Sequence, residues 1–168
     1  MILRRNRPVL ALALVSLALG PLAAAELAFD RYHRPDEAAA ALRALARDNP
    51  GFAKAHVLAE SPGGRELVLL EVGPETGRAA KALPAVFVAA NMDGAVPLAT
   101  EAALHLAELL CRKAEARADR TWYVLACGNP DAASAFFAKP LRRDPRNGRP
   151  KNDDQDDATD EDGPDDLD

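Results

Sequence analysis

Residues 84–97, PAVFVAANMDGAVP, join a short apolar run to a turn and to the first proline of a helix. The run from Pro84 to Ala90 has the length and the valine content of a strand that is buried on both faces. The residues from Asn91 to Gly94 are of the types that favour tight turns. Helical periodicity follows from about Leu98 to Lys113, so the stretch predicts a strand, a turn and a helix in succession.

Further strands flank this unit on both sides. Thr121 to Ala126 is rich in aromatic and branched residues, and a strand after the helix predicts a right-handed parallel crossover. Upstream, Ala55–Ala59 and Glu66–Val72 are separated by a turn of the sequence SPGG at residues 61–64, which predicts a hairpin beside the crossover.

The remaining elements set the limits of the domain. Pro35, followed by two acids, is typical of the first turn of a helix, and Asn49-Pro50 would end it. We therefore expect an α/β fold with a mixed sheet, an N-terminal helix, a hairpin and a strand-helix-strand crossover. Order is expected to weaken beyond Asp131. The expected organisation is a domain over residues 26–151 and a disordered acidic tail over residues 152–168.

The first 25 residues form a separate segment. Arg4, Arg5 and Arg7 precede an apolar run from Val9 to Leu19 that is too short to span a bilayer, and small residues follow at 23–25. This pattern predicts a signal peptide over residues 1–25 and a secreted or periplasmic product with no membrane association after cleavage; an uncleaved anchor is the alternative.

Charge is distributed unevenly along the chain. Cleavage after Ala25 would leave 18 basic and 26 acidic residues, a net charge that argues against nucleic acid as a partner. Six basic residues lie between Lys139 and Lys151, whereas the seventeen residues from Asn152 contain ten acids and no base. Such a segment is too polar to pack in a core.

The two cysteines, Cys111 and Cys127, leave two possibilities open. In an oxidising compartment a single disulfide bond could join them. Two separate buried thiols fit the sequence equally well.

Several short motifs, in order, resemble the zinc carboxypeptidases, the carboxypeptidase A/B-like metallopeptidases. They extend over most of the chain after residue 31, and each has a counterpart in that family: Tyr32 before the first helix, the hairpin turn ESPGGREL at 60–67, the turn NMDGAVP at 91–97, GNPD at 128–131, and RNGRP at 146–150 before acidic sequence.

The resemblance implies a zinc-dependent hydrolase that releases residues from peptide C-termini, and it also marks a departure from that chemistry. The family binds zinc through the His and Glu of an H-x-x-E motif, and the matching positions here are Asp93 and Val96. A carboxylate can bind zinc, but an isopropyl group cannot. The later histidine and the catalytic glutamate of the family have no counterpart before Asp168.

Substrate recognition is also incompletely matched. Arg142 or Arg143 corresponds to an arginine that contacts substrate in the family, whereas Gln155 lies near the position of the arginine that binds the terminal carboxylate. A neutral amide cannot replace the charged, bidentate fork of arginine. The cleft turns would be formed by Asn91 and Gly94 after one strand and by Asn129 and Asp131 after the next.

Each of these features also has a purely structural interpretation. Asp93 is of a residue type that braces or caps a turn, and Asn129-Pro130-Asp131 fits a simple turn. His105 lies within the predicted long helix, where a surface or packed histidine is the ordinary case.

The acidic tail partly resembles a calcium-binding loop. Asn152, Asp154 and Asp156 alternate as oxygen ligands do, but Asp157 stands where the loop needs glycine and Gly163 where it needs glutamate. We therefore favour a solvated acidic segment over a calcium site.

The leading interpretation is a secreted, truncated or catalytically degenerate zinc-carboxypeptidase-like protein; the alternatives are a non-catalytic peptide- or glycan-binding module and a calcium-binding protein.

Overall fold

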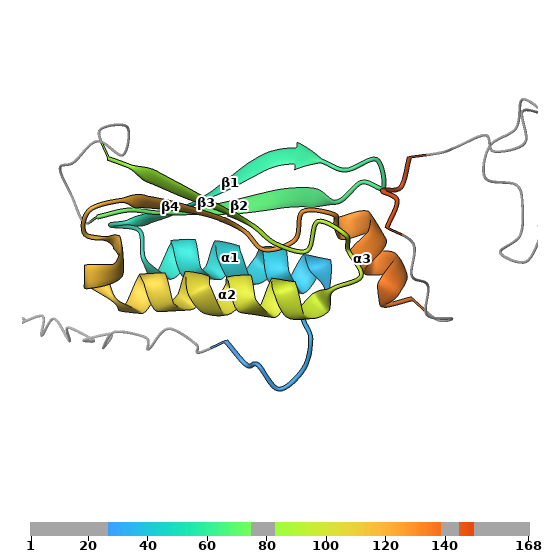
Figure 1. Ribbon diagram of the computed structural model, residues 1–168, viewed down its shortest axis with the longest axis horizontal. Helices are drawn as coiled ribbons and strands as arrows, with labels where there is room; N and C mark the ends of the chain where they lie inside the picture. The colour runs from blue at the N-terminus through green and yellow to red at the C-terminus, as the bar shows by residue number, and fades with distance from the viewer. Residues whose placement is uncertain (1–26, 75–82, 139–144, 150–168) are drawn as a thin grey trace, which may run out of the picture.

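The computed structural model describes residues 27–74, 83–138 and 145–149. The described strands form one mixed sheet in the order β1-β2-β4-β3 (Figure 1). Strand β1 pairs antiparallel with β2, β2 antiparallel with β4, and β3 parallel with β4. The expected α/β fold is confirmed, with strand bounds β1 Ala53–Glu60, β2 Glu66–Val72, β3 Ala85–Ala89 and β4 Thr121–Leu125.

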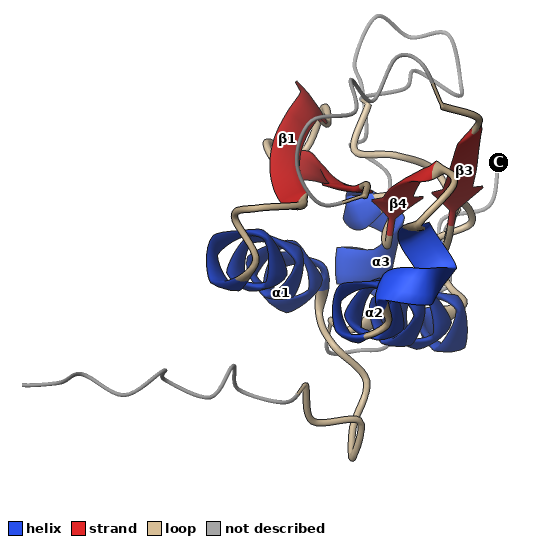
Figure 2. Ribbon diagram, turned by 90° about the vertical axis from the view of Figure 1, so that its left-hand side faces the viewer, coloured by secondary structure: helices blue, strands red, loops and turns tan. Residues whose placement is uncertain are grey.

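Helices α1 (Pro35–Asp48) and α2 (Pro97–Arg112) lie side by side on one face of the sheet (Figures 1 and 2). A 3₁₀ helix (Ala114–Arg117) follows α2, and the short helix α3 (Pro130–Phe136) lies beyond the carboxyl ends of β3 and β4. Helix α2 therefore joins two parallel neighbouring strands, as the sequence predicts.

Local chemistry sets the ends of α1. Pro35 occupies the first helical position, where a missing N–H leaves no hydrogen bond unmade. The Glu37 carboxylate accepts the backbone N–H of Arg34 at 2.8 Å. At the other end the Asn49 side chain donates to the carbonyl of Leu45 at 2.8 Å, and Pro50 cannot continue the helix.

The core lies between the two long helices and the sheet. Its most deeply buried large side chains come from both helices and from the two central strands: Leu42, Leu70, Val72, Leu104, Leu110 and Val124. Arg117 is also buried, with its guanidinium over the ring of Phe52, and it donates at 2.9 Å to the carbonyl of Leu110 near the end of α2. That bond satisfies one of the carbonyls that a helix end leaves unpaired.

One sequence-based expectation about the elements is wrong. Among the described strands, β3 lies at the edge of the sheet and is not buried on both faces, since Phe87 at its centre is 61% exposed. The apolar run predicted burial on both faces. Such a run of small and branched residues does not show which strands or helices pack against it. Helix α3 extends from Pro130 to Phe136, and most of the chain for which weaker order was expected lies outside the described residues.

The structure leaves several predictions untested. The leader, the acidic tail with its calcium hypothesis, and the positions of Arg142, Arg143 and Gln155 lie outside the described residues. Within residues 27–74, 83–138 and 145–149, no helix has the length and apolar character needed to cross a membrane.

Candidate functional site

The candidate site lies where β3 and β4 end side by side. The backbone N–H groups of Gly128 and Asn129 donate to the carbonyls of Ala90 and Asn91, at 2.9 and 3.3 Å. The two turns predicted to line a cleft are thereby brought together. Parallel strands expose their carboxyl ends at one edge of the sheet, which is where ligands of α/β proteins are usually found.

Asn91 is the residue that braces the first turn. It adopts a left-handed conformation, with φ of 49°, and only 4% of its surface is exposed. Its side-chain amide donates to Oγ1 of Thr100 at 3.0 Å, and its side-chain oxygen accepts the backbone N–H of Val96 at 3.1 Å. Asparagine tolerates this conformation better than most residues because its short side chain can bond locally.

Asp93, for which a bracing or capping role was expected, does not brace the turn in the structure. Its side chain is exposed and makes no hydrogen bond to another described residue. Val96 caps the N-terminus of α2 without any side-chain hydrogen bond and is 43% exposed. The two positions that the sequence motif predicts to correspond to zinc ligands thus present one solvated carboxylate and one exposed isopropyl group.

Gly94 and Gly128 allow the turns to pack closely. Gly94 has φ of 78°, and a Cβ placed on it would meet the side chain of Ala132 and come within 2.7 Å of the backbone nitrogen of Ala133. A Cβ on Gly128 would overlap the sulfur of Met92. Gly94 is therefore held against α3 with no space for a side chain, whereas a side chain at Gly128 would require the exposed Met92 side chain to move.

Asp131 connects three segments that are far apart in the sequence. Its carboxylate is 4% exposed and accepts four hydrogen bonds. The donors are Oγ of Ser61 at 2.7 Å, the backbone N–H of Gly63 at 3.0 Å, Nη1 of Arg65 at 3.0 Å and the backbone N–H of Gly148 at 2.8 Å. Burial alone would raise the pKa of this carboxyl, but the hydrogen bonds outweigh burial and lower it.

Asn129 adds two further bonds to the same cluster. Its side-chain oxygen accepts the backbone N–H of Ala132 at 3.2 Å and so caps α3, while its amide donates to the carbonyl of Pro145 at 2.7 Å. The segment 145–149 is therefore fastened at both Pro145 and Gly148. Asn129 and Asp131 are more than a simple turn, because they join α3, the β1–β2 turn and this segment.

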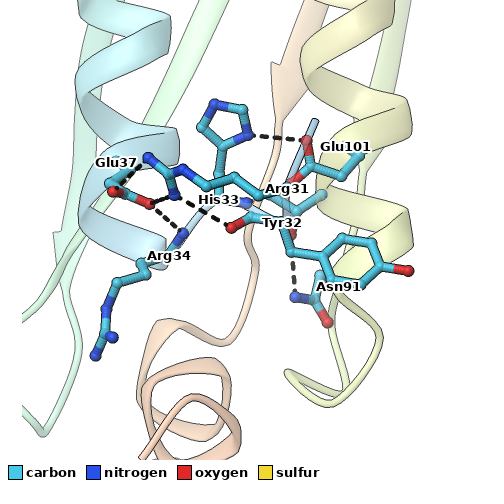
Figure 3. A network of polar contacts seen from close by, with 8 residues as sticks. Arg31, Tyr32, His33, Arg34, Glu37, Asn91 and Glu101 are labelled. Atoms are coloured by element: carbon cyan, nitrogen blue, oxygen red, sulfur yellow. Dashed lines mark hydrogen bonds and ion pairs between the residues drawn. The ribbon is translucent and has the colours of Figure 1, made fainter. Parts of the chain in front are cut away.

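The segment before α1 lies along α2 (Figure 3). The Glu101 carboxylate accepts the backbone N–H of His33 at 2.6 Å and lies 2.8 Å from its Nδ1. The ring of Phe29 packs edge-on against His105, with centroids 5.3 Å apart. His56 has a similar structural partner, Glu71 at 2.7 Å. All three histidines of the chain thus have structural contacts in the fold.

The two cysteines are free thiols in the structure. Cys111 lies in the last turn of α2, near the start of β4, whereas Cys127 follows the end of β4. The structure therefore has the two thiols in different elements with no disulfide bond between them. Burial raises the pKa of both thiols to about 11, so both are protonated at neutral pH.

Comparison with known proteins assigns the family. A model of the zinc carboxypeptidase family matches residues 38–164. The chain belongs to the zinc carboxypeptidase family. This confirms the resemblance inferred from the motifs, and the match includes both turns of the candidate site.

Solved structures agree with this fold. Carboxypeptidase A from Helicoverpa armigera has 23% sequence identity and a TM-score of 0.61, with 67% of this chain and 28% of that chain covered. Bovine thrombin-activatable fibrinolysis inhibitor, solved in complex with tick carboxypeptidase inhibitor, has 13% identity and a TM-score of 0.56, with 65% and 35% covered. Another structure of thrombin-activatable fibrinolysis inhibitor has 14% identity, a TM-score of 0.57 and coverage of 65% and 28%. The chain thus spans about a third of the length of these solved structures.

The described residues of this family member do not fit a zinc ion. A zinc site needs three or four nitrogen, sulfur or oxygen ligands in tetrahedral geometry. Among residues 27–74, 83–138 and 145–149, no three His, Cys, Asp or Glu side chains come together as such a site requires. At the two positions that the motif predicts for zinc ligands, Asp93 offers one carboxylate and Val96 offers no ligand atom.

Proposed function

We propose that this chain is an exported member of the zinc carboxypeptidase family that has lost zinc binding at the family position and does not by itself hydrolyse C-terminal peptide bonds. One observation supports this proposal above all: the turn is braced by Asn91, while the two positions expected to supply zinc ligands hold an exposed Asp93 and Val96. The fold is retained and the metal chemistry is not.

The physical reason lies in what hydrolysis requires. A metal-bound water attacks a carbonyl at neutral pH only when several protein ligands hold the ion and its charge lowers the pKa of that water. A single solvated carboxylate binds a divalent ion weakly and does not fix its geometry. Asn91 and Thr100 behind the turn are already hydrogen-bonded to each other, so they do not supply the missing ligands.

We expect the full chain, incubated with zinc and a short peptide, to release its C-terminal residue no faster than the buffer blank. Chromatographic detection of the free amino acid measures this rate. Release that needs zinc and stops on chelation would contradict the proposal.

The alternative is a non-catalytic module that binds peptide or glycan at the same turns. The rigid packing of Gly94 against α3 favours it, because a preformed surface binds with little ordering cost. Calorimetric titration with a peptide that has a free C-terminal carboxylate, and with its amidated form, distinguishes the binding module from a protein that does not bind peptide. Binding that depends on the free carboxylate without release of product would favour the binding module.

Export is the other part of the proposal, and it rests on residues 1–25. Ala23 and Ala25 are small residues spaced as signal peptidase requires, so the mature protein should begin at Glu26. Mass spectrometry of protein secreted or released from the periplasm should give the mass of residues 26–168. A purified protein that retains Met1 would overturn this prediction.

A further inference from the structure

The segment over residues 27–34, which we call the N-terminal strap, is held on helix α2 by two buried glutamates. Towards its end, the carboxylate of Glu101 accepts the backbone N–H of His33 at 2.6 Å (Figure 3). At its start, the carboxylate of Glu108 accepts the backbone N–H of Leu27 at 3.1 Å. Residues seven positions apart lie on the same face of a helix. The strap therefore runs antiparallel to α2, with one acid near each of its ends.

The carboxylate of Glu108 has unused capacity at the start of the strap. Its side chain is only 8% exposed, and Oε1 accepts both the Leu27 N–H and Nη2 of Arg112, the latter at 3.0 Å. The other oxygen, Oε2, accepts no hydrogen bond from a described residue. A buried carboxylate is costly unless its charge is matched, and the Arg112 side chain is 53% exposed, so solvent weakens that pair. Glu108 is therefore suited to a second cationic donor.

Removal of the leader would create a cation next to this carboxylate. Cleavage after Ala25 converts the backbone nitrogen of Glu26 from a neutral amide into an α-ammonium group. Two backbone carbon atoms join that nitrogen to the nitrogen of Leu27, so bond lengths alone keep the two within about 4 Å of each other. The new charge is then within about 7 Å of Oε1 of Glu108 in any conformation of Glu26. Rotation about the bonds of Glu26 can bring the two groups closer still.

Apolar contacts hold the start of the strap in place independently of this charge. The half-buried side chain of Leu27 packs against the hydrophobic core. The ring of Phe29 lies edge-on to the rings of His33 and His105, with centroids 6.1 and 5.3 Å away. An ion pair at residue 26 therefore forms on a segment that is already ordered, and little conformational entropy is lost in forming it.

We infer that the α-ammonium group of Glu26, released by cleavage after Ala25, pairs with Glu108 and fastens the mature N-terminus to α2. The inference rests on the proposed export, because only cleavage creates this charge. Glu108 thereby links processing to stability: the uncleaved chain has a neutral amide at the same place, and the processed chain has a cation beside a buried carboxylate.

The test uses protein that cells have exported and processed, whose mass shows whether it begins at Glu26. Transamination of its N-terminal residue with pyridoxal 5′-phosphate replaces the α-ammonium group by a neutral ketone. We expect this treatment to lower Tm by about 2–4 °C. In Glu108→Gln, which keeps an acceptor oxygen for the Leu27 N–H, the same treatment should change Tm by less than about 1 °C, because the anionic partner is already absent.

Glu101→Gln is the matched control. Glu101 is a buried acid of the same helix and holds the same strap, but at His33. Transamination should lower the Tm of this variant by the same amount, about 2–4 °C, as in the wild type. No effect of transamination on the wild type, or an equal effect on the wild type and Glu108→Gln, would overturn the ion pair and leave the export proposal intact. A mature chain that begins at another residue would overturn both the cleavage prediction and this inference.

Discussion

Replacing Asp131 with asparagine is expected to lower the free energy of unfolding by about 3 kcal/mol at pH 7. The carboxylate is almost fully buried and accepts four hydrogen bonds, and the loss of one partner from a buried charged pair typically costs about 3–5 kcal/mol. An amide has one acceptor oxygen, so its NH₂ group would face donors. Urea unfolding of the two full-length proteins measures the difference.

The effect should also depend on pH. The pKa of Asp131 is lower in the folded protein than in the unfolded chain, so its stabilisation is complete above the unfolded value of about 3.9. It is lost as the pH falls through the lower, folded value. The difference between wild type and Asp131→Asn should therefore be constant near neutrality and shrink in acid. Asp93→Asn, an exposed control, should change stability by less than about 0.5 kcal/mol, and equal effects of the two variants would contradict the role of Asp131.

Gly94→Ala is expected to cost about 2–4 kcal/mol. A residue with a side chain pays about 1–2 kcal/mol for the left-handed conformation, and the new methyl group would push the turn away from α3. The same unfolding measurement gives the loss, and displaced amide resonances of Ala132 and Ala133 would show its origin.

Gly51→Ala provides the comparison, because a Cβ at Gly51 meets nothing within 4 Å. It should leave the free energy of unfolding within about 0.5 kcal/mol of wild type. A Gly94→Ala protein that is as stable as Gly51→Ala would show that the turn is not held tightly against α3.

Most helices and strands could be predicted from the sequence because the residues that mark their ends lie within or next to them. Pro35 and Asn49-Pro50 mark the ends of α1, and the residues 61–64 mark the hairpin turn. The position of β3 at the edge of the sheet could not be predicted from the sequence, since it depends on which other strands pair with it. Helix α3 was missed because it is only seven residues long and its first residues also fit a turn.

The candidate site could be predicted only in part, because its turn residues are marked locally in the sequence whereas their partners are not. Asn91, Gly94, Asn129 and Asp131 were identified as turn residues, but asparagine and aspartate suit such turns about equally, so the sequence did not show that Asn91 rather than Asp93 braces the turn. The partners of Asp131 lie 66–70 residues before it and 17 after it. No local pattern reports contacts of that separation.

The most direct test of the account is the zinc content of the full chain after dialysis against zinc-containing and then zinc-free buffer. We expect well under one zinc per chain, because Asp93 is a single exposed ligand and Val96 is none. Replacing both positions, Asp93→His with Val96→Glu, should raise zinc affinity, whereas either change alone should have little effect. One tightly held zinc per wild-type chain would contradict the claim that this family member has lost its metal site.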